Sequence, residues 1–140
     1  MFPVVGDSLD LSACGRGHVV VGPRDRERPV RAEALSTGRT SAGDAYSLLS
    51  RYRLGAGSPS TTSGSLALRV GAGDGVEAEF AGTIVLAAAG VVRYAAAGHV
   101  VGGIGRLTGV GGQLAIAGEL DFATGRCRES LALTLSLAQR

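Results

Sequence analysis

The sequence predicts an all-β fold, a closed antiparallel β-barrel of about eight strands with a lumen for a small ligand. Apolar and polar residues alternate with a period of two along much of the chain, which is typical of strands that bury one face. Gly-rich segments separate these stretches at near-regular spacing, as in sandwiches and barrels. No segment of real length shows a helical period.

The first half of the chain contains four candidate strands. One begins at His18–Val21 and a second at Pro29–Ala34. The third covers Tyr46–Leu54 and the fourth Ser65–Val70, each with one apolar parity. Asp44–Leu49 could instead form one helical turn.

The second half alternates more strictly. Strands are predicted over Val76–Leu86, Val91–Ala96, Gln113–Phe122 and Leu131–Leu137, each with its apolar residues on one parity. The last segment could be a helix by composition, but Leu alternates there with Ala, Thr and Ser, which favours a strand.

Composition limits the class of protein. A length of 140 residues fits one domain, so we assign 16–140 to a single barrel and 1–15 to an N-terminal extension for which disorder stays open. Hydrophobic residues make up 45% and charged residues 19%, which excludes a disordered chain. The absence of Lys excludes a P-loop, a pyridoxal Schiff base and a lysine nucleophile. Lys and Asn, both absent, have AT-rich codons, which indicates a GC-rich bacterial genome.

Charge and hydropathy bear on partners and location. A net charge of +2 is too small to indicate nucleic-acid binding. The N-terminus lacks a signal-peptide pattern, and the longest uncharged stretch, Phe80–Val92, is too short to span a bilayer. We therefore expect a cytoplasmic protein with no membrane partner.

A closed sheet is predicted because the sequence has few residues that could protect the edge strands of an open one. Few prolines and no lysines are present to protect edge strands, and a closed barrel has no edges. An eight-stranded barrel encloses side chains or one small ligand. The apolar parity then faces the lumen and carries all three tyrosines.

Candidate ligand contacts lie on this parity. They could line a cavity in which a few polar contacts hold an apolar ligand. Alternatively, the aromatic residues could simply fill the core, with their hydroxyls reaching a barrel mouth. Tyr52 and Tyr94 are the first candidates for orienting hydrogen bonds. The predicted substrate-binding residues are Tyr46, Ser50, Phe80, Phe122, Leu66, Leu68, Ile116 and Leu133.

Two other patterns favour ordinary structure. Gly103–Gly109 resembles a dinucleotide fingerprint, but its last gap is one residue too long and no helix follows, so turn glycines explain it better. The two histidines and two cysteines lack paired ligand spacing, so we expect no metal and no cofactor. Cys14 and Cys127 could pair, although two separate thiols are favoured.

The outward parity carries charges and small residues. The charged residues on it are expected to pair across neighbouring strands; they are Arg51, Arg53, Arg69, Arg93, Glu77, Glu79 and Glu119. The mixed-sign Arg24–Arg31 stretch favours a solvated segment over phosphate binding. The many alanines would let a second subunit pack closely, which predicts a homo-oligomer (dimer or trimer), although a plain small-residue surface explains them nearly as well.

Three segments resemble the allene oxide cyclase and dirigent barrels. They are the glycine-rich His99–Gly112, the preceding Phe80–Gly90, and Val20–Pro29 with its Arg-Asp-Arg run. The polar machinery of plant allene oxide cyclases is replaced here by Val20–Gly22, and the chain has no Asn. The resemblance therefore implies the bacterial branch of the superfamily, which includes cofactor-free polyketide cyclases such as the spirotetronate Diels–Alder enzymes.

A cyclase function is physically compatible with this chain. A cyclisation can proceed when a flexible substrate is held in a near-attack geometry, and a tyrosine hydroxyl can stabilise developing charge on a carbonyl. Oxa-cyclisation would also need an acid or base, for which His99 and Glu119 are candidates beside the tyrosines. The alternatives are a non-catalytic barrel that binds or steers an apolar molecule, and a structural oligomer with a filled lumen.

Overall fold

The structure, a computed structural model, describes residues 4–5, 8–21, 30–55 and 59–136. Within these ranges the only helical element is the 3₁₀ turn η1 (Gly105–Leu107), and no helix there is long and apolar enough to cross a membrane. The strands are β1 (Val4–Val5), β2 (Ser8–Val21), β3 (Val30–Thr40), β4 (Ala45–Leu54), β5 (Ser60–Val70), β6 (Asp74–Ala88), β7 (Val91–Ile104), β8 (Gly111–Asp121) and β9 (Arg126–Ser136).

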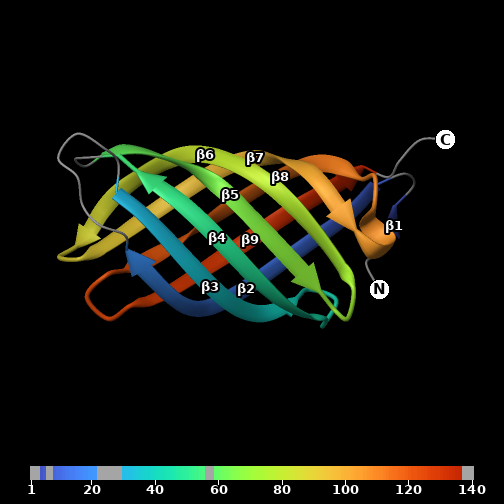
Figure 1. The fold of residues 1–140 in the computed structure, drawn as a ribbon, viewed down its shortest axis with the longest axis horizontal. Helices are drawn as coiled ribbons and strands as arrows, with labels where there is room; N and C mark the ends of the chain where they lie inside the picture. The colour runs from blue at the N-terminus through green and yellow to red at the C-terminus, as the bar shows by residue number, and fades with distance from the viewer. Residues whose placement is uncertain (1–3, 6–7, 22–29, 56–58, 137–140) are drawn as a thin grey trace.

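The eight long strands form a closed antiparallel barrel (Figure 1). Each pairs with its neighbour in sequence, and β2 also pairs with β9 from Ser8↔Ser136 to His18↔Arg126. The short strand β1 pairs antiparallel with the start of β2, Val4↔Leu9 and Val5↔Ser8. The predicted architecture and closure are confirmed.

Three strand predictions need correction. The first long strand begins at Ser8, ten residues before the expected His18, so 8–15 belong to the barrel. Its glycines weaken the apolar signal, but pairing with both β3 and β9 holds it. No helical turn covers Asp44–Leu49, because Ala45 already begins β4. Leu86, expected inside, is 58% exposed beside the register shift at the end of β6.

The inward parity otherwise matches the prediction and builds one contiguous core. Buried leucines lie toward both ends of the barrel. Leu68, Leu133 and Leu135 lie toward the end that carries η1. Leu54 and Leu120 lie toward the other end, where the β4–β5, β6–β7 and β8–β9 connections lie. We call these the η1 end and the turn end.

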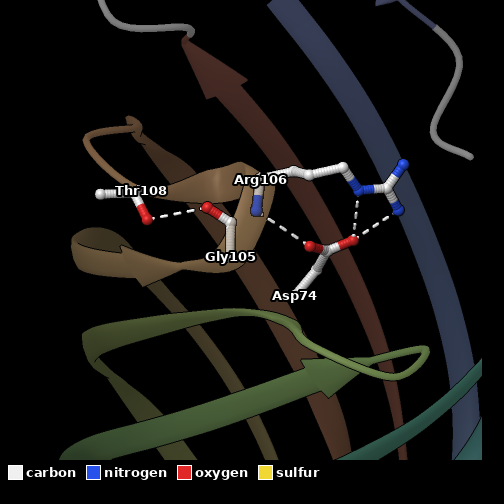
Figure 2. A network of polar contacts seen from close by, with 4 residues as sticks. All are labelled: Asp74, Gly105, Arg106 and Thr108. Atoms are coloured by element: carbon white, nitrogen blue, oxygen red, sulfur yellow. Dashed lines mark hydrogen bonds and ion pairs between the residues drawn. The ribbon is translucent and has the colours of Figure 1, made fainter.

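The η1 end is closed by the β7–β8 connection. Leu107 and Val110 of this segment are buried in the core. Asp74, at the start of β6, holds the segment in place by accepting the backbone N–H of Arg106 and its guanidinium Nε–H, both at 2.9 Å (Figure 2). Thr108 completes the turn by donating its hydroxyl to the Gly105 carbonyl at 2.8 Å.

We expect Asp74→Asn to lower the resistance to urea in a pH-dependent way. Arg106 holds the pKa of Asp74 below its ordinary value, so this contribution to stability is present above about pH 4 and is lost as the pH falls through the lowered pKa. The urea midpoint of the variant should therefore lie below that of the parent at pH 7 and approach it at pH 2–3. The same substitution at the exposed Asp10 is the matched control. Equal effects at both positions would contradict the role of the Asp74–Arg106 pair.

Candidate functional site

Two of the predicted residues meet inside the barrel. Tyr52 of β4 and Tyr94 of β7 place their hydroxyls 2.8 Å apart, and their rings pack edge-to-face with centroids 5.2 Å apart. Phe80 of β6 packs against Tyr52 in the same way, at 5.4 Å. Either hydroxyl can donate, and whichever does, the other keeps its own hydrogen. The pair therefore has one O–H left over for a ligand.

Burial sets the acidity of these phenols. It raises the pKa of Tyr52 to about 12, while hydrogen bonds from Tyr94 and Ser50 act in the opposite direction. Burial also raises the pKa of Tyr94, and so do the charge of Tyr52 and its hydrogen bond. Both phenols therefore remain protonated and serve as hydrogen-bond donors in the physiological range.

A second buried pair was not predicted. Tyr46 of β4 donates its hydroxyl to Oε2 of Glu129 on β9 at 2.8 Å, and both residues are more than nine-tenths buried. Burial raises the pKa of Tyr46, and the hydrogen bond to Glu129 raises it further. A buried carboxyl group is uncommon in a barrel lined by leucines, and such groups cluster at functional sites.

Glycines make the room for this carboxyl group. Glu129 lies between Gly15 on β2 and Gly118 on β8 in the strand register. A Cβ at Gly15 would lie 2.2 Å from the Tyr46 hydroxyl and 2.6 Å from Oε2 of Glu129. A Cβ at Gly118 would lie 3.0 Å from the Tyr94 hydroxyl. The two cross-strand neighbours of Glu129 are therefore glycines at the positions where the hydroxyls of Tyr46 and Tyr94 come close to the backbone.

The two pairs form one electrostatic cluster. The negative charge of Glu129 contributes to the raised pKa of Tyr52 and of Tyr94, besides that of its own partner Tyr46. The cluster combines one carboxyl group with three phenols inside an apolar core. Such a set can accept a proton from one atom of a ligand and donate hydrogen bonds to another.

The other predicted contact residues lie on the lumen side but differ in position. Ser50 is buried on the same strand as Tyr52. Phe122 is half-buried at the turn end. The four apolar candidates are buried in the contiguous core, namely Leu66, Leu68, Ile116 and Leu133.

The two predicted acid/base residues lie on the outer face of the barrel. His99 on β7 is exposed, with its Nε2 3.8 Å from Glu79. Glu119 on β8 faces Arg93 at 2.9 Å and Arg128 at 3.0 Å. Since neighbouring residues of a strand point to opposite faces, neither can reach the tyrosines. The carboxyl group that does lie beside them is that of Glu129. The expected pairing of outward charges across neighbouring strands is found at Arg93 and Glu119.

The cysteines point to opposite faces of the sheet. Cys14 is exposed, while Cys127 is buried on the inward face of β9, and both are free. Burial raises the pKa of the Cys127 thiol to about 11, so it stays protonated. Within the part of the chain that the structure describes, no three His, Cys, Asp or Glu side chains gather in a way that could hold a metal.

Comparison with known proteins identifies the fold. No family model matches the chain, and no curated protein matches its sequence. Two solved structures of pterocarpan synthase dirigent proteins are similar to it. One has a TM-score of 0.62 at 11% identity, over 98% of this chain and 94% of the other. The second has a TM-score of 0.58 at 12% identity, over 96% and 98%. The chain has a dirigent-like barrel fold.

Proposed function

We propose that this dirigent-like barrel is a cofactor-independent cyclase that acts on a linear, mostly apolar, polyketide-like intermediate. The observation that carries the proposal is the buried Tyr46–Glu129 hydrogen bond beside the Tyr52–Tyr94 pair. A core that served only for packing would be better filled by apolar side chains, because a buried carboxyl group is costly.

The cluster suits an oxa-cyclisation better than a purely pericyclic reaction. Glu129 takes the proton of a substrate hydroxyl while that oxygen attacks the β-carbon of an unsaturated carbonyl. The C–O bond forms as the C=C π bond breaks, and the free O–H of the Tyr52–Tyr94 pair stabilises the developing enolate oxygen. The proton then passes from Glu129 to the α-carbon, so product and substrate have the same mass.

The turn end offers the route for such a substrate. The η1 end is closed by Leu107 and Val110, whereas the turn end carries the half-buried Val92 and Phe122. A ligand that enters there passes Leu54 and Leu120 and then meets Tyr52 and Tyr94. The tyrosine rings belong to the contiguous core, so binding requires them to move apart.

The second candidate function is a barrel that binds and steers an apolar molecule without accelerating its chemistry. The names of the two similar structures combine synthase and dirigent protein. The Tyr46–Glu129 pair favours this alternative, because the Tyr46 hydroxyl already donates to Glu129 and needs no ligand as an acceptor.

The test uses a metabolite extract of the source organism with and without the pure protein. A cyclase converts one chromatographic peak into another of identical mass, and we expect Tyr52→Phe and Tyr94→Phe each to slow this conversion by about 100-fold. A retained molecule without conversion, seen by native mass spectrometry, would move the assignment to the steering barrel. Unchanged conversion by both variants would show that the tyrosine pair is not the donor.

A further inference from the structure

A shallow hollow of about 440 Å³ lies on the outer face, over strands β6 to β9. Its floor consists of small side chains such as Ala95, Ala117 and Ser130, and its walls include Arg93 and Arg128. The strand alternation separates it from the tyrosines and Glu129, which face inward. It is therefore distinct from the interior site.

One carboxylate orients both arginines. Arg93 donates from Nε and Nη2 to Oε1 of Glu119, at 3.1 and 2.9 Å. Arg128 contacts the other oxygen, Oε2, at 3.0 Å. A guanidinium has five N–H donors, so Arg93 keeps three after its two bonds to Glu119. Glu119 is only 22% exposed, while both arginine side chains are more than 60% exposed.

The positive charge of the arginines around Glu119 exceeds the single negative charge of its carboxylate. Arg16 on β2 is the direct cross-strand partner of Arg128 and is also exposed on the outer face. Like charges directly opposite each other destabilise a sheet. Three guanidinium groups against one carboxylate leave a net charge of +2 in this row, which an anion would offset.

We propose that this hollow binds the oxyanion of a small organic molecule, a carboxylate or a phosphate monoester, between Arg93 and Arg128. Guanidinium groups bind both kinds of oxyanion through paired N–H donors. Val85, which is 43% exposed beside the arginines, provides an apolar contact for the rest of the molecule. Tyr94 also lines the hollow, but the side chains that would hold the ligand, those of Arg93, Arg128 and Val85, do not belong to the interior cluster. The proposal is therefore independent of the cyclase proposal.

The larger outer hollow, of about 730 Å³, is a weaker candidate. It is lined by Arg31, Arg51 and Arg53 but also by Glu33 and Glu79. Arg51 there lies 3.7 Å from Glu33, and among the residues that the structure describes no carboxylate in this hollow bridges two arginines as Glu119 does.

The test is a titration of the whole protein with inorganic phosphate and, in a separate experiment, with acetate, both at 150 mM chloride. Two-dimensional NMR of the backbone amides monitors the binding. We expect saturable shifts in β7, β8 and β9 for at least one of the probes. Arg128→Gln should weaken this binding by at least tenfold. The matched control is Arg53→Gln, which makes the same change of charge on the outer face of β4. It should change the affinity for the probe less than twofold.

The two probes separate the two sources of the oxyanion. Saturation by phosphate alone supports a phosphate monoester, and saturation by acetate alone supports a carboxylate. Equal weakening by Arg128→Gln and Arg53→Gln would overturn the proposal, as would shifts that never saturate. Because the readout is binding at the outer face, its failure would leave the cyclase proposal untouched.

Discussion

We expect Glu129→Gln to abolish nearly all conversion by the barrel while leaving the fold intact. The amide keeps the size of the side chain and an oxygen that can accept the Tyr46 hydroxyl, which is now bonded at 2.8 Å. It cannot take the proton of a substrate hydroxyl. General base catalysis typically contributes about 100-fold to 10,000-fold, so the rate of the same-mass conversion should fall within that range.

Stability separates this catalytic role from a structural one. We expect the Tyr46→Phe/Glu129→Met double variant to unfold with a free energy equal to or higher than that of the parent, because both polar partners leave the core together. Glu129→Met alone should cost about 1–3 kcal/mol, since it leaves the Tyr46 hydroxyl buried without an acceptor. A double variant that is both less stable and fully active would show that the pair is structural.

The sequence predicts most of this fold because one face of nearly every strand is apolar. In a barrel this alternation also assigns the inner and outer faces, which is why Tyr46, Tyr52 and Tyr94 could be placed in the lumen and are found there. The failures occur where the alternation weakens. The start of β2 at Ser8 is one case, because its inward positions Gly15 and Gly17 carry no side chain.

Glu129 shows what the pattern of apolar residues hides. Leu131, Leu133 and Leu135 face inward, and the same alternation one step earlier places Glu129 inside as well. The predicted strand nevertheless begins at Leu131, because a charged residue is typical of the end of an apolar segment. The glycines at its two cross-strand positions, Gly15 and Gly118, are a signal only once the register is known. Register is a long-range property that the sequence of a single strand does not contain.

The closure of the η1 end could not be predicted for a similar reason. Asp74 and Arg106 are 32 residues apart in the chain, and the glycine-rich 102–112 segment reads as a simple turn. The structure shows that it folds back with Leu107 buried. Its left-handed residues, Gly105 and Gly109 with φ of 66° and 82°, permit the tight path that a residue with a side chain would resist.

We expect Gly64→Ala to produce the largest loss of stability among the single substitutions considered. A Cβ at Gly64 on β5 would lie 1.8 Å from the carbonyl oxygen of Arg51 and 2.9 Å from Cζ of Phe80. The first contact is with backbone, which cannot rotate away, so β4 and β5 must move apart. Overpacking costs about 1–3 kcal/mol and sometimes more, and we expect about 3 kcal/mol, or roughly 10 °C in Tm for a domain of this size.

Gly73→Ala is the matched control, since no atom lies within 4 Å of a Cβ at Gly73 and its effect should stay within about 0.5 kcal/mol. The comparison also tests the interior site, because Gly64 is the cross-strand partner of both Tyr52 and Phe80. Those two rings can pack edge-to-face only if the strand between them carries no side chain at this position. If Gly64→Ala were no more costly than Gly73→Ala, the rings would have to stand farther from β5, and the contact that brings the hydroxyl of Tyr52 to Tyr94 would lose its structural basis.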